Sequence, residues 1–310
     1  MARWRLNSRC RVFFGSPSVQ IRIGFDIIYE CPQPTPMVLM LNVHPSRQPD
    51  LEKPDRIQFS PETQSRQYFD SFGNICTRLV APAGELRIVA DTVINDIGTP
   101  EPVVPEAKQH NIADLPDEAL MFLLASRYCE TDKLVSMAWA LFGNTPAGWP
   151  RVQAICDFVN SRIRFGYPHA SPTRTAADAL SEQRGVCRDF AHLAITLCRC
   201  MNIPARYCTG YLGDIGVPLD PAPMDFSAWF EVYLDGRWYS FDARHNMPRI
   251  ARILIGRGRD AADVAITTSF GPHTLRKFTV WTDELPGPDG SRAPVVQPPS
   301  SNSFAVPVSN

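Results

Sequence analysis

The sequence predicts an α+β fold in which a small all-β domain precedes a domain of helices packed on an antiparallel sheet. Three observations predict it. Apolar residues alternate with polar ones in residues 21–97, as in strands, whereas they recur with a helical period through much of 115–285. Three prolines interrupt the intervening segment 98–114 and mark a linker. With 310 residues, 44% of them hydrophobic, the chain is long enough to bury two cores.

The first domain is expected to consist of strands joined by tight turns. The segment Ile21–Ile27 alternates apolar with more polar residues, which is typical of a strand with one buried face. A second strand is expected at Met37–Val43. Ile75–Val80 and Leu86–Ile94 flank a turn that contains proline and glycine, and this pattern predicts a hairpin. Residues 1–20 are basic and irregular, and we expect an extension outside the fold.

The second domain begins with a helical pattern. Helices are expected in four segments before residue 184, namely 115–124, 131–142, 148–165 and 175–183. The next segment, 187–201, is apolar on most sides and is followed by Pro204, which cannot continue a helix. Because a helix that is apolar all round belongs in a core, we expect 187–201 to be buried.

Strands are expected to close the second domain. Three of them are Ala205–Leu212, Phe226–Leu234 and Arg237–Asp242. Asp235–Gly236 between the last two is a strong hairpin signal. Segments 263–269 and 275–282 are expected to add strands to the same sheet. Residues 286–310 are rich in proline, serine and asparagine without periodicity, which predicts a disordered tail.

Composition excludes several classes of partner. Lysine and arginine number 31 against 32 aspartates and glutamates, so we expect neither nucleic acid nor a membrane surface as partner. No apolar run is long enough to span a bilayer. The nine cysteines show no paired framework, which favours reduced thiols and a cytoplasmic protein. The one close pair, Cys198 and Cys200, has no second half-site, so we expect no metal and no cofactor. The oligomeric state is not encoded in these patterns.

Cys187 is the candidate nucleophile. It lies in the first turn of the helix expected at 187–201, where free backbone N–H groups and the helix dipole stabilise a thiolate. Arg188 adds a positive charge, so we expect a depressed pKa for Cys187. The same amides are placed to donate to the oxyanion of an attacked carbonyl. The alternative is an ordinary core cysteine.

The hairpin that follows this helix is expected to supply the remaining groups. A thiol enzyme needs a base and a polar group that orients the base. Asp242 ends the second strand of the hairpin, where an orienting carboxylate is expected. The base is expected on the first strand, near residue 227.

Three ordered blocks surround these positions: Arg184–His192, Met224–Leu234 and Gly236–Asp242. Together they resemble the bacterial transglutaminase-like superfamily, which includes proteins assigned as cysteine proteases. The resemblance covers roughly residues 150–245, and the β domain before it is similar to the N-terminal domain that often precedes this core. It implies a papain-like scaffold, a Cys-His-Asp triad and acyl-enzyme chemistry at amide bonds.

The resemblance carries over to two of the three catalytic positions. Cys187 matches the nucleophile and Asp242 matches the orienting carboxylate. Ser227 stands where the family has its histidine, and a serine at neutral pH cannot hold a proton as imidazole does. The sequence leaves open whether Ser227 is the natural residue or an introduced replacement.

Four other residues are candidates for the base. His245 follows Asp242 by three residues and is placed to fold back toward it. His169 lies in a loop before the cysteine helix. Asp225 shares a strand face with Ser227, although a strand-end aspartate more often binds backbone amides. His192 is on the cysteine helix but about 140° around it from Cys187, so we interpret it as a buried histidine.

Two functions follow from these patterns. The first is a thiol enzyme, a peptidase, amidase or acyltransferase, that acts on a peptide or a small amide through Cys187. The second is a pseudoenzyme whose fold serves as a protein- or ligand-binding module. Rapid alkylation of Cys187 would favour the first function.

Overall fold

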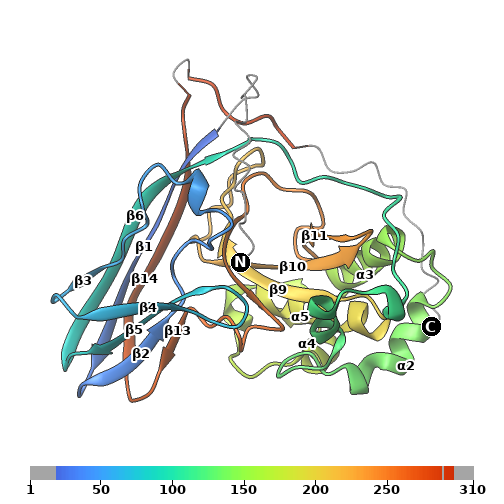
Figure 1. Ribbon diagram of the computed structural model, residues 1–310, viewed down its shortest axis with the longest axis horizontal. Helices are drawn as coiled ribbons and strands as arrows, with labels where there is room; N and C mark the ends of the chain where they lie inside the picture. The colour runs from blue at the N-terminus through green and yellow to red at the C-terminus, as the bar shows by residue number, and fades with distance from the viewer. Residues whose placement is uncertain (1–18, 288–289, 297–310) are drawn as a thin grey trace, which may run out of the picture.

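The computed structural model describes residues 19–287 and 290–296. The predicted extension at 1–20 lies almost wholly outside these residues. The α+β fold class is confirmed: Figure 1 shows a β module on the left, and on the right a sheet with helices packed against it. None of the helices in the described part of the chain is long and apolar enough to cross a bilayer.

The β module consists of two four-stranded antiparallel sheets. Its strands are β1 (Val19–Cys31), β2 (Thr35–Leu39), β3 (Gln58–Ser60), β4 (Ser65–Phe69), β5 (Ile75–Ala81), β6 (Gly84–Asp96), β13 (Thr267–Ser269) and β14 (Thr274–Leu285). The orders are β14-β1-β6-β3 and β13-β2-β5-β4. Alternate residues such as Ile23, Phe25, Met37 and Leu39 are buried in a shared hydrophobic cluster, as a period of two requires.

Two expectations about strand pairing are wrong. The segments 263–269 and 275–282 were expected beside the cysteine helix, but β13 pairs with β2 and β14 pairs with β1. The chain therefore returns to its first module after building the second. β5 and β6 were expected to form a hairpin, but they lie in opposite sheets. Alternation predicts that a strand has one buried face, yet it does not specify which strand lies beside it.

The second module contains the predicted helices and three strands that were not expected, two of which form a short sheet of their own. The helices are α1 (Asp117–Leu120), α2 (Thr131–Phe142), α3 (Trp149–Arg162), α4 (Ala176–Glu182) and α5 (Cys187–Cys200), with short 3₁₀ turns η2 (Ile112–Asp114), η3 (Met121–Leu123) and η4 (Tyr167–His169). A further 3₁₀ turn, η1 (Gln48–Asp50), lies in the β module. The strands are β7 (Arg164–Phe165), β8 (Arg184–Gly185), β9 (Ala205–Tyr211), β10 (Ser227–Leu234), β11 (Arg237–Phe241) and β12 (Ile253–Gly258). The main sheet has the order β11-β10-β9-β12. The sequence patterns did not indicate β7, β8 or β12.

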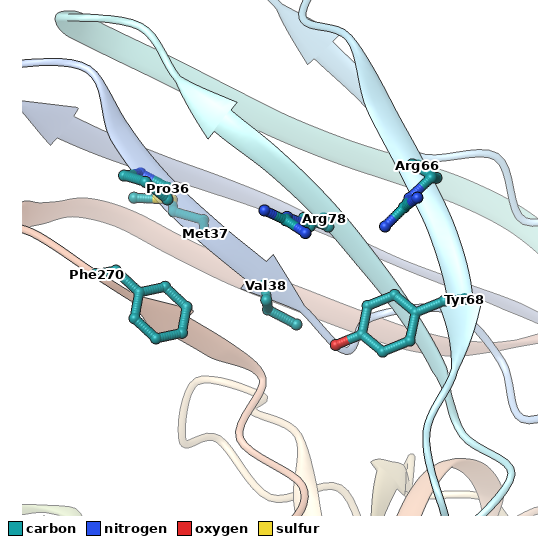
Figure 2. A pocket seen from close by; sticks show the side chains of 7 residues that line it. All are labelled: Pro36, Met37, Val38, Arg66, Tyr68, Arg78 and Phe270. Carbon is teal, nitrogen blue, oxygen red and sulfur yellow. The ribbon is translucent and has the colours of Figure 1, made fainter.

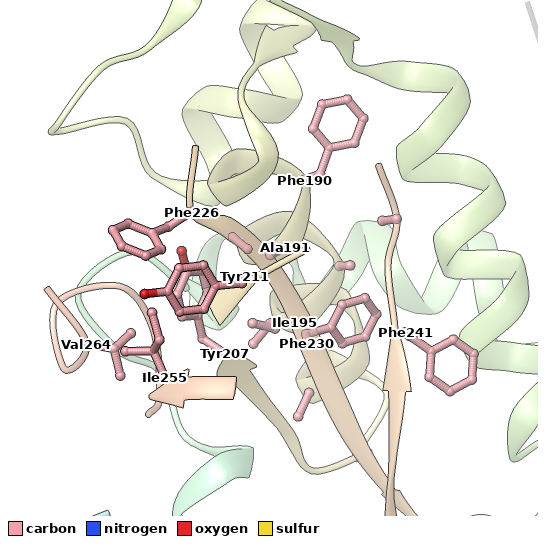
Figure 3. Packing of buried hydrophobic residues seen from close by; sticks show 14 of the residues in the cluster. Phe190, Ala191, Ile195, Tyr207, Tyr211, Phe226, Phe230, Phe241, Ile255 and Val264 are labelled. Carbon is pink, nitrogen blue, oxygen red and sulfur yellow. The ribbon is translucent and has the colours of Figure 1, made fainter. Parts of the chain in front are cut away.

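The central helix α5 is buried as predicted. Its residues from Asp189 to Cys200 are all buried. Figure 3 shows Ala191 and Ile195 of α5 among the aromatic side chains of β9 and β10, with Phe230 beside Ile195. This packing fixes the start of α5 against the sheet and so determines the position of Cys187.

The two modules meet next to the start of β10. The ring of Phe226 lies 6.2 Å from that of Phe25 on β1 and 5.8 Å from that of Phe278 on β14. The returning strand therefore contributes to the wall behind Ser227.

Part of the predicted tail also contacts the fold. The Val296 backbone N–H donates to the Gly216 carbonyl at 2.7 Å, and Val296 is buried. The expectation of disorder from 286 onward is wrong for this part, because Val296 has an apolar site to fill. Residues 297–310 lie outside the described residues.

Candidate active site

Cys187 is the first residue of α5, and the start of this helix is firmly anchored. Asp189 accepts a hydrogen bond from the Val186 backbone N–H at 2.8 Å and lies 3.3 Å from a nitrogen of Arg174. Gly185 packs against the same carboxylate, and a Cβ at Gly185 would come within 2.6 Å of it. Cys187 is partly exposed, whereas the other cysteines of the described residues are buried.

The Cys187 thiol is protonated at neutral pH. Burial raises its pKa to about 11, and the negative charge of Asp225 adds to the rise. The positive charge of Arg244 and a hydrogen bond from the Ala228 backbone N–H act in the opposite direction. Attack by this thiol on a carbonyl therefore requires a base.

The expectation of a depressed pKa for Cys187 is wrong. One reason is desolvation next to a carboxylate, which outweighs the helix end. The other is the direction of Arg188. Its guanidinium donates to the Ser171 carbonyl and lies 5.4 Å from the centroid of the Tyr128 ring.

Asp242 directly follows β11 and is almost fully buried. Its Oδ1 accepts hydrogen bonds from the backbone N–H groups of Arg244 at 2.8 Å and His245 at 3.1 Å. Its Oδ2 accepts one from the Arg252 guanidinium at 2.9 Å and lies 2.7 Å from His245 Nδ1. Burial alone would raise the pKa of Asp242, but the charges of His245 and Arg252 outweigh it and hold this pKa well below its usual range. Asp242 is therefore ionised at neutral pH.

His245 is oriented by this carboxylate. An ionised carboxylate only accepts hydrogen bonds, so Nδ1 of His245 carries the proton in their contact. In the uncharged form of the ring, Nε2 has a free lone pair, which is the arrangement of a general base. The side chain of His245 is 24% exposed and lines a small cavity together with Ser227 and Asp225.

Ser227 begins β10 and is buried. Phe230 pairs with Phe241, and continuing this register places Asp242 opposite Trp229, two residues from Ser227 on the same face. A long side chain at 227 reaches such a diagonal neighbour, whereas a serine is too short. The carboxylate of Asp242 binds His245 instead.

Asp225 binds a backbone amide. Its Oδ1 accepts a hydrogen bond from the Phe226 N–H at 2.6 Å. Burial raises the pKa of Asp225, while this hydrogen bond and the charge of Arg244 act against the rise. Its main effect on the site is the negative charge that it places near Cys187.

Replacing Asp225 with asparagine should lower the pKa of Cys187, because it removes a negative charge that opposes thiolate formation. We expect alkylation of Cys187 by iodoacetamide at pH 9 to accelerate, by up to about tenfold for a shift of one pKa unit. Mass spectrometry of the labelled peptide measures the rate. Asp220→Asn, which also changes a residue of the cavity wall, is the matched control. Equal rates in the two variants would contradict this role of Asp225.

The cavity beside Ser227 is small and partly open to solvent. Its volume is about 60 Å³, room for about two water molecules. Tyr167 and the segment 220–225, which connects β9 to β10, supply much of its wall. This volume takes only a small part of a peptide, so most of a peptide substrate would lie outside the cavity.

The other two histidine candidates lie elsewhere. His192 is fully buried and stacks on Tyr128 with an interplanar angle of 10°, and its Nε2 accepts a hydrogen bond from the Ala261 backbone N–H. It is a packed core histidine, as interpreted from the sequence. His169 ends η4 and is not part of the cavity wall, although Tyr167 in the same turn is.

Two arginines of the site were not found from the sequence. Arg244 lowers the pKa of Cys187, and its guanidinium lies 3.6 Å from the centroid of the Phe165 ring. Arg252 binds Asp242 from ten residues further along the chain. The only available signal was Asp242 at a strand end, because such aspartates often fold the next residues around their carboxylate.

Comparisons with known proteins show similarity around this site. A model of the transglutaminase-like superfamily matches residues 139–243, which include Cys187, Ser227 and Asp242. An uncharacterized protein of Mycobacterium leprae is 28% identical over 224 residues, which cover 68% of this chain and 77% of that protein. An uncharacterized protein of Mycobacterium tuberculosis is 34% identical over 133 residues, which cover 37% of this chain and 40% of that protein.

A solved structure is similar over most of the chain. It is described as a putative cysteine protease from Cytophaga hutchinsonii and is 29% identical, with a TM-score of 0.74. The similarity covers 87% of this chain and 92% of that one, so it includes both the β module and the module that carries Cys187.

Proposed function

We propose that the protein is a thiol enzyme of the transglutaminase-like superfamily that acts on amide bonds through Cys187, on the basis of the family match over residues 139–243 and the similar solved structure. The observation that carries the proposal is the 2.7 Å contact between His245 Nδ1 and Asp242 Oδ2. It supports a base that comes from the loop after β11, in place of the strand position that Ser227 occupies.

In the proposed reaction, Cys187 Sγ attacks the carbonyl carbon of an amide while His245 Nε2 takes the thiol proton. The tetrahedral intermediate then breaks its C–N bond, and the leaving amine takes the proton from His245. The resulting thioester on Cys187 is attacked by water, which gives hydrolysis, or by an amine, which gives acyl transfer. His245 removes the proton of the attacking group and returns it to Cys187 Sγ as the C–S bond breaks, while Asp242 holds the imidazole throughout.

The charges around the thiol support a link between Cys187 and His245. The thiol responds to Asp225, Arg244 and Asp242. Asp225 lines the same cavity as His245, Arg244 precedes it in the chain, and Asp242 binds it. The two proposed reacting groups thus share their charged neighbours.

A second candidate function is a binding module that has lost catalysis. Two observations favour it: the thiol pKa of about 11 and the small volume of the cavity, about 60 Å³. In this case Cys187 behaves as an isolated, partly buried thiol and His245 does not influence it.

Alkylation of Cys187 as a function of pH distinguishes the two functions. An isolated thiol with a pKa of about 11 should react about tenfold faster for each unit of pH up to that value. In an enzyme, His245 accepts the proton. We then expect the rate of alkylation of Cys187 at pH 7 to be higher than the rate that this pH dependence of an isolated thiol predicts. Iodoacetamide labelling followed by peptide mass spectrometry measures it, and the buried Cys156 serves as the internal reference.

If the alkylation rate of Cys187 follows the pH dependence of an isolated thiol in both the parent and His245→Asn, the proposal of a thiol enzyme is wrong. The binding module would then be the better description. If the rate at pH 7 is higher than that of an isolated thiol in the parent but equals it in His245→Asn, the proposal of a thiol enzyme is supported.

The free cysteines support a reducing compartment as part of the proposal. All eight cysteines in the described residues are unpaired. A thiol nucleophile has to remain reduced, and the cytoplasm maintains that state. The proposed substrate is a peptide or a small amide.

A further inference from the structure

A groove crosses the outer face of the sheet β13-β2-β5-β4, on the β module. Its volume is about 550 Å³, much larger than that of the cavity beside Ser227. Its wall includes Pro36, Val38, Arg66, Tyr68, Arg78 and Phe270. Figure 2 shows Phe270 at one end of the groove, Tyr68 and Arg66 on β4 at the other end, and Arg78 on the neighbouring strand between the two ends.

Two like charges face each other in this groove. Arg66 on β4 is directly opposite Arg78 on β5 in the antiparallel register. Directly opposed residues have Cβ atoms about 5 Å apart, and like charges in such a pair destabilise a sheet. Neither guanidinium has a hydrogen bond or an ion pair within the part of the chain that the structure describes.

In the other sheet of the module, three arginines form ion pairs with carboxylates. Arg22 pairs with Asp91, Arg87 pairs with Asp26, and Arg276 pairs with Glu30, each between neighbouring strands. Arginines of the sheet β14-β1-β6-β3 are thus neutralised by carboxylates on neighbouring strands. Arg66 and Arg78, on the sheet β13-β2-β5-β4, are opposite each other and have no such carboxylate among the described residues.

Protection of a sheet edge does not explain the pair. A charged residue on an edge strand prevents pairing with other chains, and β4 is an edge strand, so Arg66 fits that role. Arg78 lies on β5, which is paired on both sides. A second charge there adds repulsion without protecting an edge.

The ends of the groove are apolar and open. Tyr68 is 41% exposed, Phe270 is 66% exposed, and Val80 next to the groove is 54% exposed. The face between β4 and β13 crosses three inter-strand gaps, or about 14 Å. An inorganic anion that binds both guanidinium groups is too small to reach the aromatic ends, whereas a short stretch of extended peptide is long enough.

We propose that this groove binds an acidic peptide segment that carries an aromatic or aliphatic side chain beside its carboxylates. The carboxylates pair with Arg66 and Arg78 through charge-assisted hydrogen bonds and remove the repulsion between them. The apolar side chain packs against Tyr68 or Phe270. This binding does not involve Cys187 and stands apart from the proposed catalysis.

The test uses the full chain and a fluorescein-labelled hexapeptide of alternating glutamate and phenylalanine, blocked at both ends. Fluorescence anisotropy should give saturable binding that weakens as salt rises. The double variant Arg66→Gln/Arg78→Gln should bind at least about tenfold more weakly, a loss of about 1.4 kcal/mol. Arg56→Gln, which changes an exposed arginine of the same module outside the groove, should bind like the parent.

A stability measurement separates binding from folding. Because the substitutions remove like-charge repulsion, the double variant should unfold at the same temperature as the parent or at a higher one. Binding should also persist in Cys187→Ala, so a failure of catalysis leaves this result unaffected.

Four outcomes would overturn the proposal. The first is equal binding of a peptide with glutamine in place of glutamate. The second is full binding by the double variant. The third is competition by inorganic phosphate at the same concentration as the peptide, which would identify a small-anion site. The fourth is an oligomer in sedimentation experiments that dissociates in the double variant, which would identify a second copy of the chain as the occupant.

Discussion

Replacing His245 with asparagine should lower the turnover of amide substrates by about 10²–10⁴-fold, the usual contribution of a general base. Asparagine retains a group that can donate a hydrogen bond to Asp242, but it cannot take a proton from Cys187. Because the Cys187 thiol has a pKa of about 11, little thiolate forms at pH 7 without a base. Turnover is measured by product release from the blocked peptide amide that reacts fastest in a screen.

A second substitution makes this result specific to the base. Ser227→His in the His245→Asn background places an imidazole where the family has one, on the same strand face as the position opposite Asp242. We expect it to restore turnover by at least about tenfold, because the new ring is within reach of Asp242, which can orient it. His273→Asn, which changes an exposed histidine of the β module, is the matched control and should leave turnover unchanged. Parent-level turnover in His245→Asn would remove His245 from the mechanism.

The helix and hairpin of the second module were predictable because their signals are local. The apolar run from Cys187 to Met201 and Pro204 after it defined α5 to within one residue. Asp235 and Gly236 both have positive φ, 47° and 82°, which is what an Asp-Gly hairpin turn requires. Such signals depend only on residues that are neighbours in the chain.

The pairing of β14 with β1 was not predictable from local patterns. Val280 and Thr282 are buried and their neighbours are less buried, as in a strand with one buried face, but alternation does not reveal the partner. The contacts of Arg252 are non-local in the same way, since Glu101 comes from the expected linker. The expectation of a depressed pKa for Cys187 was wrong because burial and the charge of Asp225 raise this pKa, and neither can be read from the residues next to Cys187 in the chain.

Replacing Arg252 with methionine should lower the free energy of unfolding by about 3–5 kcal/mol, the usual effect of removing one partner from a buried ion pair. The guanidinium is almost fully buried between Glu101 Oε1 at 2.7 Å and Asp242 Oδ2 at 2.9 Å. Methionine fills similar space but leaves two carboxylates without this partner. Urea unfolding followed by circular dichroism at pH 7 measures the change. Arg252→Lys keeps the charge without the planar fork of donors, so its free energy of unfolding should lie between those of the parent and Arg252→Met.

The same variant should change the response to acid. In the parent, the pKa of Asp242 is lower in the folded state than in the unfolded chain, so its contribution is present above about pH 4 and is lost as pH falls below that value. Without Arg252 the pKa of Asp242 rises toward the unfolded value, because one of the charges that lower it is gone. As pH falls below about 4, the free energy of unfolding should therefore decline less steeply in Arg252→Met than in the parent.

A double-mutant cycle identifies the pair as the cause. If Arg252 acts through Asp242, the loss in Arg252→Met/Asp242→Asn should be smaller than the sum of the two single losses, because each single change leaves the other charge buried. Additive losses would mean that Arg252 stabilises the fold through Glu101 or through the Trp229 ring, whose centroid lies 5.3 Å from its guanidinium carbon. Turnover in Arg252→Lys compared with Arg252→Met would then show whether the orientation of His245 depends on this arginine, since a lost orientation lowers turnover even at a pH where both variants are folded.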